Sequence, residues 1–429
     1  MQFEDAVRAL EARQPEHMPG PSLDRIRELV AYLDHPERTF PTVHVTGTNG
    51  KTTTARVTTT IACAHGLRAG LYTSPHLTSI RERFAVCGEE ITEEEFAEEW
   101  ARLAPVLEVV DGLGHGPVTY FEAATALAFL WFADRPVGVG VIEVGMGGAW
   151  DATNVVAGEV AVVCPIGMDH VQQLGPGLVD IAREKAGIIK PGSVAIVRSQ
   201  EDAAAAVLRA RGEEVGATLR WEGEDWAVAD RRIAVGGQLV AVRTPLATYD
   251  ELFLPLHGEH AARNAAAGVA AFEALVERAL DEEALRSALA DVRTPGRLEV
   301  VGHAPLVILD GAHNPAGAQA LRTALGEAFL WQRLHVVLAV SADKDLPGIC
   351  GAIAPIADAV WATRNDTVRS ADPDEVAEVC ASLGLEVRTA PSVGAALEAA
   401  RSGADEGDAI VVTGSLFTVA DARRALGLA

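Results

Sequence analysis

Apolar residues along the chain follow two periods that alternate with each other. Short apolar runs bounded by glycines at 137–145, 159–167 and 192–199 are typical of buried parallel strands. The stretches 22–34 and 119–134 have helical periodicity, and the second is apolar on most sides, as in a buried helix. Strands that alternate with helices predict an α/β fold built on a doubly wound, mostly parallel sheet.

The pattern predicts two domains. Residues 219–256 contain several short strands with tight turns, which we interpret as a small β-rich element appended to the first domain. Pro295-Gly296 is a predicted hinge. After it, strands and helices alternate again, except that the apolar runs 333–341 and 356–364 follow each other without a predicted helix. We therefore expect a domain at 1–295 and a smaller Rossmann-like α/β domain at 296–429.

Composition and net charge restrict the classes of partner and the cellular location that we expect for this protein. The 429 residues are 49% hydrophobic and 22% charged, as in ordinary globular proteins. A net charge of −24 argues against nucleic-acid partners and anionic membranes. The chain begins without the pattern of a signal peptide and lacks a long apolar span, so we expect a cytoplasmic protein with no membrane partner. The five cysteines are far apart, which predicts buried reduced thiols.

The stretch "GTNGKTT" has the character of a phosphate-binding loop. Its end matches G-x-x-x-x-G-K-[ST], but the early glycine stands only three residues before Gly50, which shortens the loop. A β-branched strand precedes it and a Thr-rich predicted helix follows, which favours nucleotide binding over a structural glycine turn. The predicted ATP ligands are Gly47, Thr48, Asn49, Gly50, Lys51, Thr52 and Thr53. Lys51 would contact phosphates, and Thr52 or Thr53 would offer a hydroxyl to Mg²⁺.

Other candidates follow predicted strands. Glu143 ends one strand and His170 follows another, and both would face the ligand crevice of an open α/β sheet, where they could hold Mg²⁺. A satisfied buried glutamate and a structural histidine are the alternatives. Lys185 is by spacing alone an ordinary solvated lysine. Asp310 and His313 end a strand of the second domain, where ligand contact and simple turn formation are both open.

These features combine into a resemblance. The chain closely resembles the folylpolyglutamate synthase/dihydrofolate synthase family of the Mur ligase superfamily from about residue 20 to its end. The segments that carry it, in order, are "HVTGTNGKTTT", "YTSPHL", "VIEVGMGGAWDATN", "MDHVQQLG", "REKAGIIKPG", "RTPGRLE", "ILDGAHNPAG" and "VVTGSLFTVADAR". The shortened loop is how this superfamily builds its ATP site.

The resemblance implies an ATP-dependent amide ligase. A folate or dihydropteroate carboxylate would attack the γ-phosphate of ATP, and L-glutamate would then attack the resulting acyl phosphate. Thr53, Ser74, Glu143 and His170 would surround two Mg²⁺ ions, with a carbamylated Lys185 in support. Asn264, Arg297 and Asp310 would contact the nucleotide, Asp310 at its ribose. His313 and Ser415 would lie near glutamate or the transferred phosphoryl group. Tyr120 and Phe121 would line the pterin side, or simply pack in the core.

The resemblance has limits. Thr52 stands where the family often has glycine, Ala149-Trp150 where it commonly has Arg-Leu, and Ala261 where it has glutamine. A Mur ligase that extends a UDP-muramyl precursor is the alternative enzyme, although no N-terminal uridine-binding domain precedes residue 47. A non-catalytic relative would be expected to have lost Lys51, Glu143 or Lys185. A monomer is typical of the family, and the preference between dihydropteroate and tetrahydrofolate stays open.

Overall fold

The computed structural model describes residues 2–15, 20 and 22–428. The chain separates into two compact units. The first unit extends as far as Val292, apart from the short segments 233–238 and 256–260. These two segments belong to the second unit, together with the chain from Arg293 onward.

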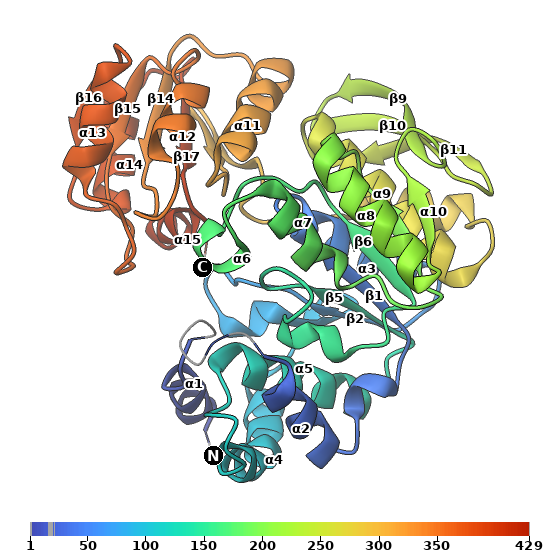
Figure 1. Ribbon diagram of the computed structural model, residues 1–429. Coiled ribbons are helices and arrows are strands. Elements are labelled where there is room, and N and C mark those ends of the chain that lie inside the picture. The colour runs from blue at the N-terminus through green and yellow to red at the C-terminus, as the bar shows by residue number, and fades with distance from the viewer. Residues whose placement is uncertain (1, 16–19, 21, 429) are drawn as a thin grey trace. The chain divides into compact units, whose positions relative to one another are not determined.

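An eight-stranded sheet is the centre of the first unit (Figure 1), and its strand order is β4-β3-β2-β5-β1-β6-β7-β8. The six strands from β2 to β8 in this order are parallel, and β3 and β4 are antiparallel additions at one edge. The bounds are β1 Thr42–Thr46, β2 Ala69–Tyr72, β3 Phe84–Val86, β4 Glu89–Glu90, β5 Val139–Glu143, β6 Val160–Val163, β7 Val194–Val197 and β8 Thr218–Trp221. The prediction of a doubly wound, mostly parallel sheet is confirmed.

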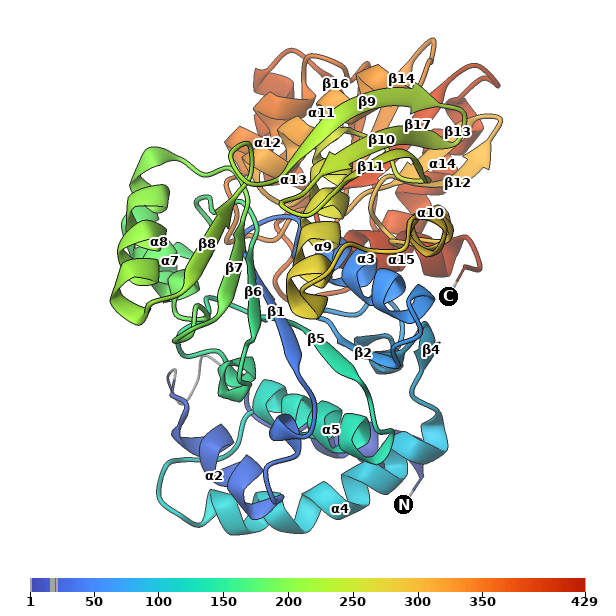
Figure 2. The same cartoon turned by 90° about the vertical axis from the view of Figure 1, so that its right-hand side faces the viewer.

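Helices cover both faces of this sheet, which explains why its central strands β1, β5 and β6 are buried throughout. Figure 2 shows α5 and α4 on one side of the strands and α3 and α9 on the other. The helices of the first unit are α1 Phe3–Glu11, α2 Asp24–Tyr32, α3 Lys51–Ala64, α4 Glu93–Asp111, α5 Tyr120–Asp134, α6 Val171–Leu174, α7 Leu178–Ala186, α8 Asp202–Val215, α9 Glu259–Val276 and α10 Glu282–Ala290. Single 3₁₀ turns occur at Pro36–Arg38, Ile80–Arg83 and Ala152–Val155.

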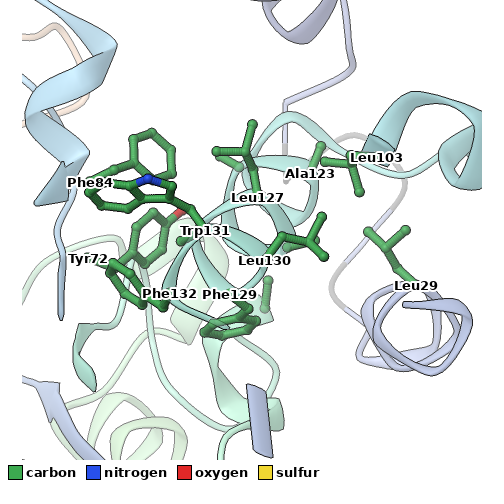
Figure 3. Packing of buried hydrophobic residues seen from close by; sticks show 14 of the residues in the cluster. Leu29, Tyr72, Phe84, Leu103, Ala123, Leu127, Phe129, Leu130, Trp131 and Phe132 are labelled. Carbon is green, nitrogen blue, oxygen red and sulfur yellow. The ribbon is translucent and has the colours of Figure 1, made fainter. Parts of the chain in front are cut away.

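Helix α5 is the centre of a large apolar cluster. Its residues from Phe121 to Phe132 are all buried, which confirms the prediction of a helix apolar on most sides. Figure 3 shows Leu127, Leu130 and Trp131 of this helix among side chains from α2, α4 and the strands. A capping box starts the helix, because Thr119 Oγ1 accepts from the Glu122 amide while Glu122 accepts from the Thr119 amide.

The predicted β-rich element at 219–256 is divided between two sheets. Strand β8 joins the large sheet as its last parallel strand, paired with β7. Strands β9 Ala227–Ala234, β10 Gly237–Arg243 and β11 Thr248–Leu254 form a separate three-stranded sheet. The interpretation as one appended element is therefore wrong for β8. Turn residues show where strands end, but they do not show with which strand each one pairs.

The second unit contains a six-stranded sheet with the order β12-β13-β17-β14-β15-β16. Only β12 is antiparallel in it. The strands are β12 Glu299–His303, β13 Leu306–Leu309, β14 Leu334–Leu338, β15 Ala359–Ala362, β16 Glu386–Thr389 and β17 Ala409–Thr413. The helices are α11 Pro315–Ala328, α12 Leu346–Ile353, α13 Pro373–Ser382, α14 Val393–Gly403 and α15 Leu416–Ala425.

Helix α12 was not predicted. Its sequence "LPGICGAI" contains two glycines and a proline, which disfavour helix by propensity. The proline stands in the first turn, where its missing N–H costs nothing, and Asp345 accepts from the Gly348 amide as the N-cap. Burial of Ile349, Cys350 and Ile353 then outweighs the weak propensity. No helix among the described residues combines the length and apolar character that a membrane span needs.

The prediction of five reduced thiols is wrong for two of them. Cys63 near the end of α3 and Cys87 after β3 form a disulfide with a Cα–Cα distance of 5.7 Å. Cys164, Cys350 and Cys380 are free and buried. The turn after β3 returns to β2, since the Cys87 amide donates to Ala69 O, and this brings Cys87 beside the end of α3. A spacing of 24 residues contains no sign of that return.

Reduction of the disulfide is expected to lower the free energy of unfolding by about 3 kcal/mol, because the bridge restricts a loop of this length in the unfolded chain. Urea unfolding with and without dithiothreitol measures the effect, and Cys63→Ser/Cys87→Ser should not respond to the reductant. Mass spectrometry of the purified protein that shows both thiols free would contradict the bridge. Since the cytoplasm keeps most thiols reduced, the compartment of expression has to be controlled.

Candidate active site

The phosphate-loop candidate connects β1 to α3, as predicted. Gly47 has φ +142° and Gly50 has φ +94°, values that side chains rarely adopt. Space excludes side chains as well, because a Cβ on Gly47 would lie 2.5 Å from the Cβ of Cys164. A Cβ on Gly50 would lie 2.5 Å from Oδ1 of Asn264. Helix α3 starts directly after the loop at Lys51, so its free amide groups and its dipole favour an anion there.

Two lysines meet at this loop. Nζ of Lys51 donates to the carbonyls of Gly47 and Thr48, at 3.0 and 3.3 Å. Nζ of Lys185, on α7, donates to the same Gly47 carbonyl at 3.0 Å. Lys185 is buried, and desolvation, followed by the charge of Lys51, lowers its pKa to about 7. Spacing alone suggested a solvated lysine, whereas the fold places this amine under the phosphate loop.

Glu143 contacts the first turn of α3. The carboxylate is buried at the carboxyl end of β5, and its Oε1 accepts from the Thr52 hydroxyl at 2.9 Å. Parallel pairing of β1 with β5 sets Glu143 opposite Val45, just before the loop. Thr52, the position where the family often has glycine, therefore supplies the hydroxyl that contacts this carboxylate. Thr53 is buried in the same helical turn.

The predicted magnesium ligands lie at neighbouring strand ends. Ser74 follows β2, Glu143 ends β5, and His170 lies in the loop after β6 with φ +49°. The described residues contain no group of three His, Cys, Asp or Glu side chains that could hold a metal. Magnesium usually takes only one or two carboxylates, and hydroxyls, substrate phosphates and water complete its shell. The oxygen donors at Glu143, Thr53 and Ser74 fit that mode of binding.

A pocket of about 160 Å³ opens beside Ser74. Phe121 lines it, and its ring packs on Gly145, where a Cβ would lie only 2.5 Å away. Tyr120 is not part of the lining, and its ring lies 5.3 Å from the guanidinium of Arg83. Consecutive helical residues point about 100° apart, so the predicted pair does not share one environment. The lining residues are Ser22, Arg25, Ser74, Pro75, Arg83, Thr119, Phe121, Glu122, Gly145, Met146, Trp150, Asp151 and Ala152.

Charged residues of this pocket were missed from the sequence. Nε of Arg25 donates to both carboxylate oxygens of Glu122 at 3.0 Å, and both side chains are buried. Arg83 is buried and donates to Nδ1 of His76 at 3.0 Å. Arg25 lies in an amphipathic helix, where an arginine is normally solvated. No local signal distinguishes it, because its partner is 97 residues away.

Two further departures from the family pattern, Ala149 and Trp150, have structural accounts. Ala149 packs so closely on Gly187 that a Cβ there would lie 2.4 Å from its own. A longer side chain at 149 would need a different approach of these two segments. Trp150 lines the pocket, so it enlarges the apolar wall available to a substrate ring. Ala261 is buried in the first turn of α9, and nothing in the structure explains the replacement.

In the second unit, four predicted residues gather at one edge of the sheet. Asp310, His313 and Ser415 follow the adjacent parallel strands β13 and β17. Arg297 lies over the same loop, since a Cβ on Gly311 would be 2.8 Å from its Nη1. This edge holds the carboxyl ends of the parallel strands, where ligands of open α/β sheets bind.

Two of these four residues also have structural roles. The Asp310 carboxylate accepts from the amides of Leu298 and Ala312, both at 2.9 Å. Ser415 is the N-cap of α15 and accepts from the Phe417 amide at 3.2 Å. His313 shares a hydrogen bond of 2.9 Å between Nδ1 and Gly311 O, which orients the ring.

Comparison with known proteins decides the family. Residues 45–272 match the Mur ligase middle domain, and residues 296–416 match the Mur ligase, glutamate ligase domain. The dihydrofolate synthase/folylpolyglutamate synthase of Mycobacterium tuberculosis is 40% identical over 97% of this chain and 92% of its own length. The chain belongs to the folylpolyglutamate synthase/dihydrofolate synthase family. The Bacillus subtilis member is 32% identical over 95% of both chains.

Solved structures of the family agree with this fold. A Mycobacterium tuberculosis folylpolyglutamate synthase complexed with ADP has a TM-score of 0.95 and 39% identity, covering 99% of this chain and 98% of that one. Escherichia coli FolC in complex with DHPP and ADP has a TM-score of 0.89 and 31% identity, covering 100% and 98%. Both structures match across the two units, and the two matched domains identify this chain as a Mur-type ligase.

Proposed function

We propose that this protein uses ATP to join L-glutamate to a folate, to dihydropteroate, or to both. The carboxylate of the acceptor attacks the γ-phosphorus of ATP, which forms an acyl phosphate and releases ADP. The α-amine of L-glutamate then attacks the acyl carbon, and an amide and inorganic phosphate result. Phosphorylation is needed because a carboxylate by itself has no adequate leaving group.

The observation that carries the proposal is the phosphate loop, whose Gly47 carbonyl holds both Lys51 and Lys185 beside Glu143 and Thr52. Little covalent work falls to the protein in phosphoryl transfer, so positioning and neutralisation of charge dominate. Lys51 moves onto the phosphates of the bound nucleotide and offsets their negative charge. The backbone amides of Gly47–Thr53 and the N-terminus of α3 complete the cradle for the phosphates.

Magnesium and a modified lysine belong to this proposal. The residues that would hold Mg²⁺ are Thr53, Ser74, Glu143 and His170, and a bound Mg²⁺ would neutralise phosphate charge. Lys185 as a carbamate would supply a hard oxygen to the same region. Solved structures of relatives include complexes with ADP, AMPPCP and DHPP, which supports a small-molecule site.

The acceptor is assigned to the pocket beside Ser74. Its wall combines Phe121, Met146 and Trp150 with buried charges, which suits a flat polar ring system. Curated relatives with dihydrofolate synthase and folylpolyglutamate synthase in their names favour such a ring over a UDP-muramyl precursor. In the second unit, we assign Arg297 and Asp310 to the nucleotide and His313 and Ser415 to glutamate or the transferred phosphoryl group.

Release of inorganic phosphate tests the proposal. The assay contains ATP, Mg²⁺ and L-glutamate, with dihydropteroate and tetrahydrofolate supplied in separate reactions. Phosphate release that requires one or both acceptors, together with a product heavier by one glutamate residue, would support it. Turnover with a UDP-muramyl acceptor and with neither pteridine would replace it by the Mur ligase alternative. We further propose a cytoplasmic monomer without nucleic-acid or membrane partners, and size-exclusion chromatography tests its oligomeric state.

Asp310→Ala is expected to raise KM for ATP while kcat stays nearly unchanged, because a ribose contact is felt equally in the ground and transition states. The loss of two backbone hydrogen bonds should also lower stability, so the control is Asp358→Ala. That carboxylate accepts from the Leu334 amide at 2.7 Å in the same sheet, before β15. If the KM for glutamate rises instead, Asp310 belongs to the amino-acid site.

A further inference from the structure

The side-chain amide of Asn264 lies directly against the phosphate loop. Asn264 is buried on α9, and a Cβ on Gly50 would lie 2.5 Å from its Oδ1 and 3.0 Å from its Nδ2. The orientation of this amide therefore decides whether an acceptor or a donor group is available to an anion in the loop.

A hydrogen bond from Arg198 determines the orientation of the Asn264 side-chain amide. Its Nη1 donates to Oδ1 of Asn264. A guanidinium has only donors, so the atom that faces it is the oxygen, and Nδ2 points away with two N–H groups. Within the described part of the chain, no acceptor is hydrogen-bonded to Nδ2 of Asn264. These two N–H groups suit an acceptor atom of a nucleotide.

Glu222 in turn holds Arg198. Nε of Arg198 donates to Oε2 of Glu222 at 2.8 Å, and the Ser199 amide donates to the same oxygen at 2.7 Å. Both charged side chains are buried, with 4% and 8% of their areas exposed. Arg198 directly follows β7 and Glu222 directly follows β8, and these strands pair in parallel with Val197 opposite Trp221. Two neighbouring strand ends thus form one rigid support for an amide on α9.

We propose that Arg198 and Glu222 are positioning residues for nucleotide binding, which act by fixing the amide of Asn264 with its N–H groups toward the nucleotide. This inference rests on the proposed use of ATP. A purely structural ion pair would instead affect folding and leave nucleotide affinity unchanged. No sequence pattern marks either residue, because each follows a strand and resembles an ordinary surface charge.

The test measures the Kd of Mg²⁺-ADP by calorimetry on the full chain, which needs neither an acceptor nor glutamate. Asn264→Asp keeps an oxygen for Arg198 but removes the donor, and we expect about tenfold weaker binding, the value of one lost hydrogen bond. Arg198→Met/Glu222→Gln avoids an unpaired buried charge and should weaken binding by a similar factor. Arg198→Lys, which lacks the fork that reaches both partners, provides a second variant if the first does not fold.

A mutant cycle tests whether Arg198 and Glu222 affect nucleotide binding only by orienting the Asn264 amide or also by stabilising the surrounding structure. Adding Arg198→Met/Glu222→Gln to Asn264→Ala should cause no further loss, since the pair acts only through the amide. In turnover assays the pair variant should raise KM for ATP at constant kcat. The control, Arg13→Met/Asp111→Asn, removes another partly buried ion pair of 2.7 Å and should bind ADP like the wild type.

Two results would overturn the inference. One is a folded pair variant with the wild-type Kd, and the other is a loss in the triple variant equal to the sum of the separate losses. If the wild-type chain itself fails to bind ADP, the proposed ATP site is wrong, and that outcome is distinct from either of the first two.

Discussion

Lys51→Ala should leave a folded protein whose ligase activity is reduced on the order of 100-fold or more. Its ammonium is free to exchange two backbone carbonyls of the loop for nucleotide phosphates, where negative charge develops during transfer. Removing one preorganised group at such a position typically costs 10²–10³ in kcat. The measurement is single-turnover formation of ADP, with unfolding midpoints recorded to show that the fold is intact.

Lys190→Ala is the matched control for this variant. Lys190 is also a partly buried lysine that donates to a backbone carbonyl, that of Asn154, at 2.9 Å, but it lies before β7 and away from the loop. Its removal should affect stability more than rate. Near-normal turnover by folded Lys51→Ala would remove the phosphate loop from the mechanism, and with it the central argument for ATP use.

Lys185→Ala is expected to lose activity by roughly 10- to 100-fold, the usual cost of disturbing the groups that support a metal shell. As an ammonium, Lys185 would repel Lys51 and Mg²⁺. The fold lowers its pKa to about 7, by burial first and by the charge of Lys51 second, so the neutral amine is accessible at neutral pH. That amine can add CO₂ and lose one proton, which gives an anionic carbamate.

Chemical rescue distinguishes the carbamate from a plain buried amine. Acetate or another short carboxylic acid should partly restore Lys185→Ala, because it returns a carboxylate to the space that the side chain left. A density map should show three additional heavy atoms on Nζ. Full activity of the wild type after exhaustive removal of CO₂, with a bare amine in the map, would exclude the carbamate.

Lys185 also has a consequence for stability. Its folded pKa lies below the ordinary value for lysine, so the unfolded chain binds more protons between about pH 7 and 10.5. The contribution of this residue to stability should therefore increase as the pH rises through that window. Comparison of urea midpoints of the wild type and Lys185→Met across these pH values checks the sign.

Local sequence was informative wherever a feature is continuous in the chain. The strand, the glycine-rich turn and the helix around Lys51 follow one another, and the left-handed φ values at Gly47 and Gly50 explain why glycine stands there. The apolar helix α5 and the strand that ends at Glu143 were likewise predicted, because the pattern of apolar residues along a short segment indicates both its secondary structure and its burial. Asp310 and His313 became candidates because they stand directly or shortly after a predicted strand.

Features that depend on distant pairs were not predictable in this way. The bridge between Cys63 and Cys87 requires the β2–β3 return, and β8 could be assigned to the large sheet only from its pairing with β7. Helix α12 formed against its propensity because burial outweighed two glycines. In each case the stabilising contacts join residues that are far apart in the sequence, and short-range sequence patterns contain no information about such contacts.

The sequence by itself determined the alternation of strands and helices, the phosphate loop and the positions of Lys51 and Glu143, because backbone conformation and strand ends are local properties. Only the tertiary structure decided that Lys185 is buried under the loop, that Thr52 rather than Thr53 contacts Glu143, and that Arg198 orients Asn264. Burial, pKa and the direction of an amide depend on what surrounds a side chain, and its neighbours here come from strands and helices far apart in the chain.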